Sequence, residues 1–179
     1  DYKGVENCQQ CHTGALRTFP GFASWQATLH SKIHELPTTT TMKGNYTETV
    51  NMGASYGNAT VTFRIAGSNY FIQFNPIGGS MVEYQVVYTY GGGWKQRYLV
   101  KIGSSYYMPP VQWNSNKYKD NSSGAWVTYN PQNWFTAAGA LKPIDNVFRT
   151  KSWDKNCAGC HVVPGTHTNT VSKVVTGTD

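Results

Sequence analysis

Two short segments of the sequence carry the same pattern of cysteine and histidine, C-x-x-C-H. They lie near the two ends of the 179-residue chain and hold all 4 of its cysteines: Cys8, Cys11 and His12 in the first, Cys157, Cys160 and His161 in the second. Two residues between the cysteines place both thiols on about one helical turn, at a separation that suits two vinyl groups of one porphyrin. The next residue can turn an imidazole toward the iron. The pattern therefore predicts two covalently bound c-type haems.

Paired cysteines have other uses in proteins. They occur in zinc sites with four thiolate ligands, in dithiol redox pairs and in structural disulfides. None of these requires a histidine directly after the second cysteine, whereas here a histidine follows both pairs. Haem attachment explains the pattern better than the three alternatives.

Each haem iron has two axial positions, and the histidines of the chain limit how these are filled. There are 5 histidines. His12 and His161 are the ligands expected from the motifs, which leaves His30, His34 and His167 as candidates for the two opposite, distal positions. One candidate is in excess. It is either idle or serves the haem of a neighbouring subunit.

Two of these candidates lie in a segment with helical periodicity. Residues 22–36 stand between two prolines and place apolar side chains three or four positions apart, which predicts an amphipathic helix. His30 and His34 are four residues apart and are expected on a common face of that helix. His30 is the preferred distal ligand, because Trp25 can pack the helix against the porphyrin.

Methionine is the other common distal ligand of c-type haem. Met108 stands directly before Pro109 and Pro110, an arrangement that small monohaem cytochromes also present. Packing at the end of a strand explains this methionine more simply. Bis-histidine ligation is therefore expected for both haems, with low-spin, six-coordinate iron of comparatively low potential.

The sequence between the motifs has the alternating pattern that is typical of β-strands. Short alternating runs rich in Val, Ile, Tyr, Phe and Thr predict strands over residues 59–66, 70–75, 81–90, 94–102 and 105–112. Three glycines at 91–93 predict a hairpin. A short helix or turn is expected at 130–135, and a helical segment at 153–161. The predicted fold is mainly β with few short helices: one compact domain in which an antiparallel sheet of four to six strands is inserted between two haem-binding segments.

The predicted boundaries follow from these elements. Residues 1–37 form the N-terminal haem segment with its ligand helix, 38–143 form the β-rich insert, and 144–179 form the C-terminal haem segment and a tail. The net charge is +6, but the charges are scattered and the haem propionates need cationic neighbours, so nucleic acid is not an expected partner. There is no apolar run long enough to span a membrane.

The composition favours a location outside the cytoplasm. Charged residues make up only 13% of the chain, and covalent haem attachment takes place beyond the cytoplasmic membrane. The chain starts without a basic and apolar leader, so we interpret it as a mature secreted form at the cell surface or outside the cell, with the periplasm as the alternative. Sequons at Asn45, Asn58 and Asn121 are compatible with a glycosylated exterior.

Several of these residues resemble a known family. Trp25 to His30 matches W-x-x-[ST]-x-H after a C-x-x-C-H motif, which is similar to multihaem c-type cytochromes. Residues 94–99, 108–114, Trp126 and the closing motif resemble members with a β-sheet insert, similar to the subunits of extracellular cytochrome filaments. The resemblance implies that His30 is a distal haem ligand. Family members usually carry more than two haems, whereas this chain has two motifs.

Electron transfer is the function that these features favour. The expected partners are other cytochromes or identical subunits, assembled head to tail into a filament in which a ligand histidine crosses the boundary. An alternative is a small haem enzyme, a peroxidase or an oxyanion reductase with one open iron, although few carboxylates lie near the motifs to act as acid or base. A third is a β-rich glycan-binding module in which Trp94, Trp113, Trp126 and Trp134 line the site; core packing explains these tryptophans more simply.

Overall fold

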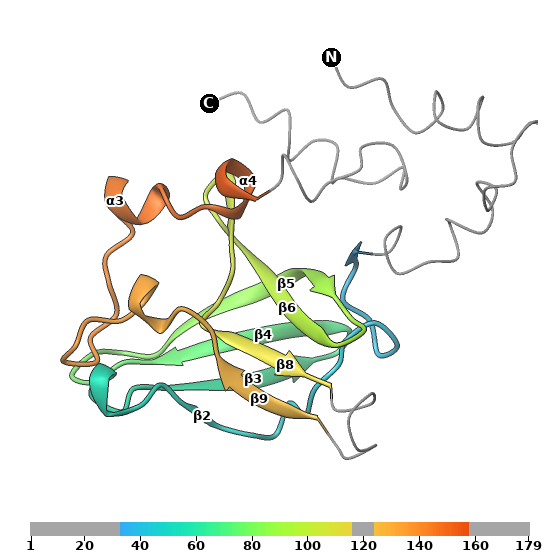
Figure 1. Cartoon of the computed structure of the whole chain (residues 1–179), viewed down its shortest axis with the longest axis horizontal. Coiled ribbons are helices and arrows are strands. Elements are labelled where there is room, and N and C mark those ends of the chain that lie inside the picture. Colours follow the sequence, from blue (N-terminus) through green and yellow to red (C-terminus); the bar gives the residue numbers. More distant parts are fainter. Residues whose placement is uncertain (1–32, 116–123, 158–179) are drawn as a thin grey trace, which may run out of the picture.

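The computed structural model describes residues 33–115 and 124–157. This part of the chain is mainly antiparallel sheet with a few short helical turns, which confirms the predicted fold class (Figure 1). The strands are β1 (His34–Glu35), β2 (Val50–Asn51), β3 (Thr60–Ala66), β4 (Asn69–Asn75), β5 (Val82–Gly91), β6 (Lys95–Ile102), β7 (Ser105–Tyr107), β8 (Val111–Asn114) and β9 (Ala125–Thr128). The helical segments are η1 (Ala54–Tyr56), η2 (Pro131–Asn133), α3 (Asn146–Arg149) and α4 (Trp153–Asn156).

The strands form one sheet that curls back on itself. Their order is β2-β3-β4-β5-β6-β8-β9, with β1 paired to β5 and β7 paired to β6, and every pairing is antiparallel. The curl brings the outer strands β2 and β9 near each other. The predicted hairpin at the three glycines joins β5 to β6, where Gly91 pairs with Gln96 and adopts a φ of 77° that favours glycine.

The predicted number of strands was too low for the described part of the chain, which contains nine strands. Two of the additional ones, β1 and β2, have only two residues each, too few for alternation to reveal them. β9 was also missed. The strand predicted over 105–112 is divided into β7 and β8 at Pro109 and Pro110, because proline has no N–H to donate to a ladder. The short helical segment predicted at 130–135 is present as η2.

The helix predicted over residues 22–36 was wrong at its C-terminal end, and residues 22–32 lie outside the described residues. His34 and Glu35 form β1 and pair with Tyr90 and Thr89 of β5. The N–H of Gly91 also donates to the carbonyl of Ile33 at 2.7 Å. Pro37 disfavours helical geometry at the residue before it, while the edge of β5 offers hydrogen bonds to an extended chain. His34 therefore does not share a helix face with His30.

The main core lies inside the curl of the sheet. On β4, Tyr70, Ile72 and Phe74 point inward and alternate with less buried residues, as expected for a strand with one face in the core. The rings of Phe63 and Trp126 stack across this core with centroids 4.2 Å apart. The side chains of Trp126 and Trp134 are 9% and 2% exposed, which confirms that these two tryptophans are core residues.

A β-bulge in β5 gives the sheet a second core on its outer face. Val86 pairs with Val100 in the main core, but after the register shift Tyr88 pairs with Leu99 and both point to the opposite face. One extra residue reverses the direction of the side chains that follow it. The second core, as we call it below, comprises Tyr88, Leu99 and Trp153, with Val87, Tyr90, Tyr106, Met108 and Cys157 packed against it.

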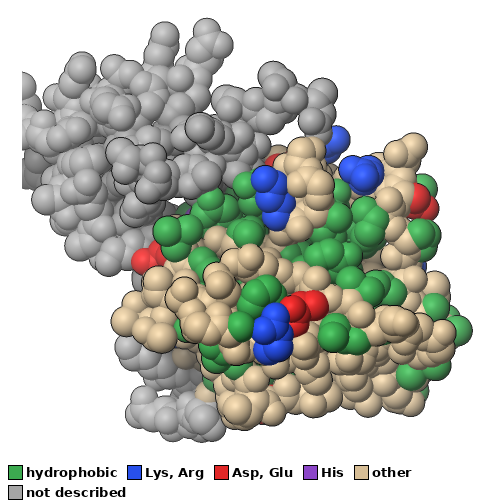
Figure 2. Space-filling model, turned by 180° about the vertical axis from the view of Figure 1, so that it is seen from behind, with side chains coloured by type: hydrophobic (Ala, Val, Ile, Leu, Met, Phe, Trp, Pro, Cys, Tyr) green, Lys and Arg blue, Asp and Glu red, His purple; other side chains and the backbone are tan. Residues whose placement is uncertain are grey.

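Charged side chains are sparse on the surface. Figure 2 shows the face turned away from the viewer of Figure 1, where Lys, Arg, Asp and Glu are few and scattered among uncharged groups. One ion pair joins Arg64 of β3 to Glu83 of β5, and Gln73 of β4 donates to the same carboxylate. Within the described residues, no helix is long and apolar enough to cross a membrane.

Tyr98 makes the stability of the main core sensitive to alkali. Its side chain is fully buried, its hydroxyl donates to the carbonyl of Lys43 at 2.5 Å, and burial raises the pKa of its phenol well above the ordinary value of 10. The unfolded chain loses this proton above pH 10 while the folded chain keeps it. The stability contributed by Tyr98 is therefore complete below pH 10 and falls by up to about 1.4 kcal/mol per pH unit above it.

The measurement is the free energy of unfolding in urea, followed by far-UV circular dichroism below and above pH 10. Tyr98→Phe should be less stable than the wild type at neutral pH, by about 1–3 kcal/mol, because its partner carbonyl loses a buried donor. Its stability should also fall less steeply above pH 10. Equal slopes for both proteins would contradict the role given to Tyr98.

Candidate haem-binding site

The described residues include two of the predicted site residues, one from each end of the chain. They are His34 in β1 and Cys157, the first cysteine of the second motif. The other predicted residues lie outside the described ranges: Cys8, Cys11, His12, Trp25, His30, Cys160, His161 and His167. The candidate site is therefore built around His34, Cys157 and the residues that hold them.

Cys157 lies at the C-terminal end of α4, which confirms the first four residues of the helix predicted over 153–161. Its N–H donates to the carbonyl of Trp153 at 2.8 Å, so the two side chains are separated by one helical turn. The carboxylate of Asp154 accepts a hydrogen bond of 2.8 Å from the N–H of Tyr106 in β7. This bond attaches the short helix to the sheet and fixes the position of Cys157, the first cysteine of the second motif.

Trp153 is the centre of the second core. Its side chain is 1% exposed and packs on Leu99 of β6 and on Tyr88, which the bulge in β5 turns outward. Cys157 packs against the same cluster and is half-buried. The thiol therefore lies at the rim of an apolar, aromatic surface and not in open water.

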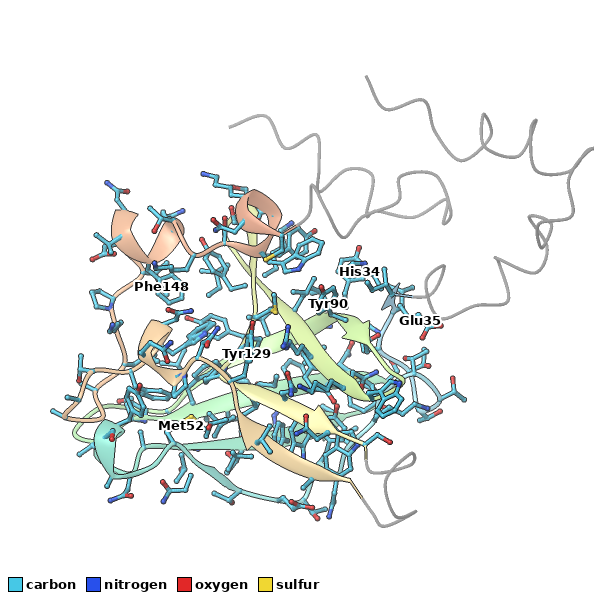
Figure 3. All side chains as sticks on the ribbon, in the orientation of Figure 1. His34, Glu35, Met52, Tyr90, Tyr129 and Phe148 are labelled. Carbon is cyan, nitrogen blue, oxygen red and sulfur yellow. The ribbon has the colours of Figure 1, made fainter. Side chains whose placement is uncertain are left out.

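His34 reaches this cluster from the other end of the chain. Its side chain is 6% exposed and lies opposite Tyr90 in the β1–β5 pairing, with ring centroids 5.0 Å apart. The imidazole also meets the ring of Trp153 edge to face, at 4.8 Å. Figure 3 shows His34 and Tyr90 together at this end of the sheet. His34 and Cys157 are more than a hundred residues apart in the sequence. In the fold, His34 contacts Trp153 of α4, the helix that ends beside Cys157.

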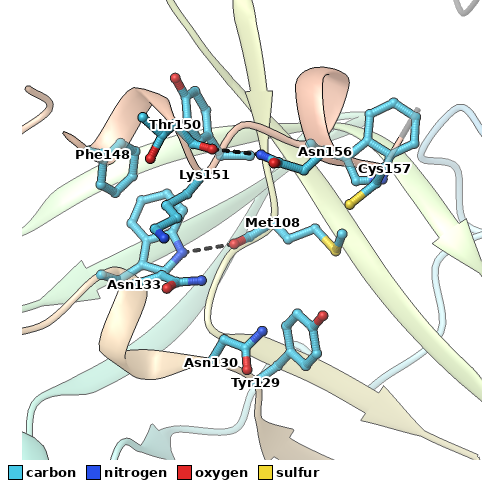
Figure 4. Close-up of a pocket in the computed structure, with 12 residues that line it drawn as sticks. Met108, Tyr129, Asn130, Asn133, Phe148, Thr150, Lys151, Asn156 and Cys157 are labelled. Carbon is cyan, nitrogen blue, oxygen red and sulfur yellow. Dashed lines mark hydrogen bonds between the residues drawn. The ribbon is translucent and has the colours of Figure 1, made fainter. Parts of the chain in front are cut away.

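A cavity of about 220 Å³ opens beside Cys157. Figure 4 shows Met108, Tyr129 and Cys157 around one end of it, and Phe148 and Asn133 at the other. The walls are held by hydrogen bonds: Trp134 donates from Nε1 to the carbonyl of Met108 at 2.8 Å, and the Asn156 amide donates to the carbonyl of Thr150 at 2.7 Å. The cavity is therefore bounded by anchored backbone as well as by side chains.

Positive charge lies close to this site. Lys151 lines the cavity, and the guanidinium of Arg97 lies 3.9 Å from the centre of the Tyr129 ring, which also lines it. Burial raises the pKa of the Tyr90 phenol above its ordinary value, while the charge of Arg97 acts in the opposite direction. Burial likewise raises the pKa of Tyr106. These phenols stay neutral at physiological pH, and the nearby cations suit an anionic group.

These residues fit one edge of a covalently attached porphyrin. The aromatic side chains in the lining, Trp153 among them, suit the flat macrocycle, and Lys151 and Arg97 suit its propionates, while asparagines and a threonine make the rest of the wall polar. The indole Nε1 of Trp153 is buried and has no hydrogen-bond partner among the described residues, as expected where an acceptor belongs to a cofactor. No group of three or more His, Cys, Asp or Glu side chains that could hold a bare metal ion occurs within 33–115 and 124–157.

Sequence reasoning missed several residues of this site. Trp153 precedes Cys157 by four positions, and this helical spacing was a usable signal. Tyr90 carried no such signal, because its place beside His34 depends on the pairing of β1 with β5. Met108 was correctly expected to pack against apolar neighbours, and it belongs to the second core.

Comparison of the chain with protein-family models, with curated proteins and with solved structures gave no match. The assignment of the site depends on its own residues and geometry.

Trp153 should be essential for the stability of the site. Replacing it by Ala removes the centre of the second core, and the loss of a fully buried tryptophan costs about 3–5 kcal/mol of unfolding free energy. Trp94→Ala is the matched control: its side chain is 64% exposed, and its loss should change stability by no more than about 0.5 kcal/mol. Urea unfolding of both variants measures the difference. Similar small losses would show that Trp153 does not organise this region.

Proposed function

We propose that this protein is a dihaem c-type cytochrome that transfers electrons through two bis-histidine haems. The observation that carries the proposal is the pair of C-x-x-C-H motifs, which hold every cysteine of the chain and place a histidine after each pair. Each motif would supply two thioether bonds and one axial ligand, from His12 and His161. Bound haem supplies one-electron exchange between the ferric and ferrous states of its iron.

The arrangement of the sheet supports exchange between the two sites. β1 adjoins the segment that contains the first motif, and α4 leads directly into the second. The ring of His34 in β1 contacts the ring of Trp153 in α4, so these two elements meet. The end of the described chain therefore lies beside its start at β1, which favours a short path between the two proposed haems.

The residues around Cys157 would act on the cofactor without taking part in bond making. Trp153, Tyr90 and Tyr88 would exclude water from one side of it, which lowers the polarity around the iron and affects its potential. Lys151 and Arg97 would balance the charge of the propionates. A rigid surround of this kind suits electron transfer, because the site changes little between the two oxidation states.

Location and partners belong to the same proposal. Covalent haem attachment and the low content of charged side chains favour the cell surface or the exterior, with the periplasm as the alternative. The proposed partners are other cytochromes or identical subunits that assemble head to tail, with a ligand histidine crossing the boundary. Electron microscopy of the native material separates filaments from monomers. A compact monomer with both irons fully ligated would oppose the filament.

The test of the function compares the wild type with a variant that lacks the second attachment site, Cys157→Ser with Cys160→Ser. The wild type should take up two electrons per chain in a reversible redox titration, and the variant one. The ferric wild type should give only low-spin signals in electron paramagnetic resonance and should bind cyanide slowly. A high-spin signal with rapid cyanide binding would instead support the alternative, a haem enzyme with one open iron.

A further inference from the structure

We propose that His34 is the distal ligand of the haem attached at Cys157 and Cys160. This inference depends on the proposed function, since it requires a haem at the second motif. It assigns one histidine to one iron, which the sequence left open among three candidates. It also means that the ligand comes from the N-terminal haem segment and crosses to the C-terminal one.

The position of His34 is determined by backbone pairing. β1 pairs with β5 so that His34 lies opposite Tyr90, and the bond from the N–H of Gly91 to the carbonyl of Ile33 holds the strand at its start. An extended conformation turns the imidazole toward the second core, which the bulge in β5 creates on that face. The placement does not depend on the helix that was predicted for this segment.

The imidazole is next to the attachment helix. Its ring contacts that of Trp153 at 4.8 Å, and Trp153 is bonded through its carbonyl to the N–H of Cys157. A haem attached at Cys157 would lie beside α4, and a histidine next to α4 would be available to hold its iron. His34 occupies such a position; the other histidines of the chain lie outside the described residues.

Burial distinguishes His34 from a surface histidine. Its side chain is 6% exposed and lies between the rings of Tyr90 and Trp153, so its position is fixed by the second core. From that position it would present a ring nitrogen to an iron held beside α4. Tyr90 and Trp153 would also fix the plane of the ring, as the neighbours of metal-bound histidines usually do.

Met108 is the rival ligand, since its side chain also packs against the second core beside Cys157. The other described methionines are far less suited, because Met42 and Met52 belong to the main core and Met81 is 50% exposed. Met108 has an ordinary packing role as a half-buried side chain that fills an irregular cavity. A buried histidine between two rings is harder to explain by packing alone, which favours His34.

The assignment has a consequence for the pair of haems. If His30 serves the first iron, as the family resemblance implies, the two distal ligands are four residues apart. Their Cα atoms are then separated by no more than about 14 Å even in a fully extended chain. The short strand would thus hold the two haems close together. His167 would be the surplus histidine, and a filament of such subunits would then be held by contacts other than a shared ligand.

The test is the spin state of the ferric protein in three variants of the full-length dihaem chain. His34→Ala should convert one of the two haems to high spin in electron paramagnetic resonance, and added imidazole should restore the low-spin signal. Met108→Leu should leave both haems low-spin. In a chain that also carries Cys157→Ser and Cys160→Ser, His34→Ala should change nothing, because the affected haem is absent.

A second variant keeps the test decisive if His34→Ala fails to fold. His34→Met retains a ligand at the same position and should add a long-wavelength sulfur-to-iron charge-transfer band and raise one potential. Met81→Leu is the matched control, which should leave the spectrum unchanged. An unchanged spectrum in His34→Ala, no new band in a folded His34→Met, or a high-spin signal in Met108→Leu would overturn the assignment. If one of these outcomes occurs while the variants still contain two haems, the ligand assignment fails and the proposed function stands. If the wild type contains no haem, both are overturned.

Discussion

The pairing of β1 with β5 is the interaction on which the rest of the site depends. Two residues, His34 and Glu35, add to the edge of a ten-residue strand, and this short ladder brings the start of the described chain beside its end. His34 then meets Trp153, and Trp153 holds the helix that presents Cys157. Without this pairing the sheet would still have a core, but β1 would not bring His34 into contact with α4.

The bulge in β5 makes that support possible. A regular strand would direct Val86, Tyr88 and Tyr90 to one face, and all three would belong to the main core. The register shift turns Tyr88 outward, so that one strand contributes to two cores on opposite faces. The main core stabilises the sheet, and the second core provides an aromatic surface for α4. The same strand thereby couples the stability of the sheet to the geometry of the candidate site.

The sequence predicted the features whose signals are local. Alternation located β3 to β6, and the three glycines located the hairpin between β5 and β6. Prediction from the sequence failed where distant residues determine the local structure. His34 is four residues from His30, a spacing that suits a helix, but it lies in a strand because it pairs with the edge of β5. The cysteines and histidines of the motifs were recognisable because each motif lies within five consecutive residues. The residues around Cys157 were not, since Tyr90 and Trp153 meet His34 only in the folded chain.

The account requires two haems that are covalently attached through the four cysteines. Intact mass spectrometry of the denatured full-length protein, produced in a host that attaches haem to C-x-x-C-H motifs, measures this directly. The account predicts a single species heavier than the polypeptide by the mass of two haems, with no cysteine left for a thiol reagent. A polypeptide of unmodified mass with four reactive thiols, or with two disulfides, would contradict it.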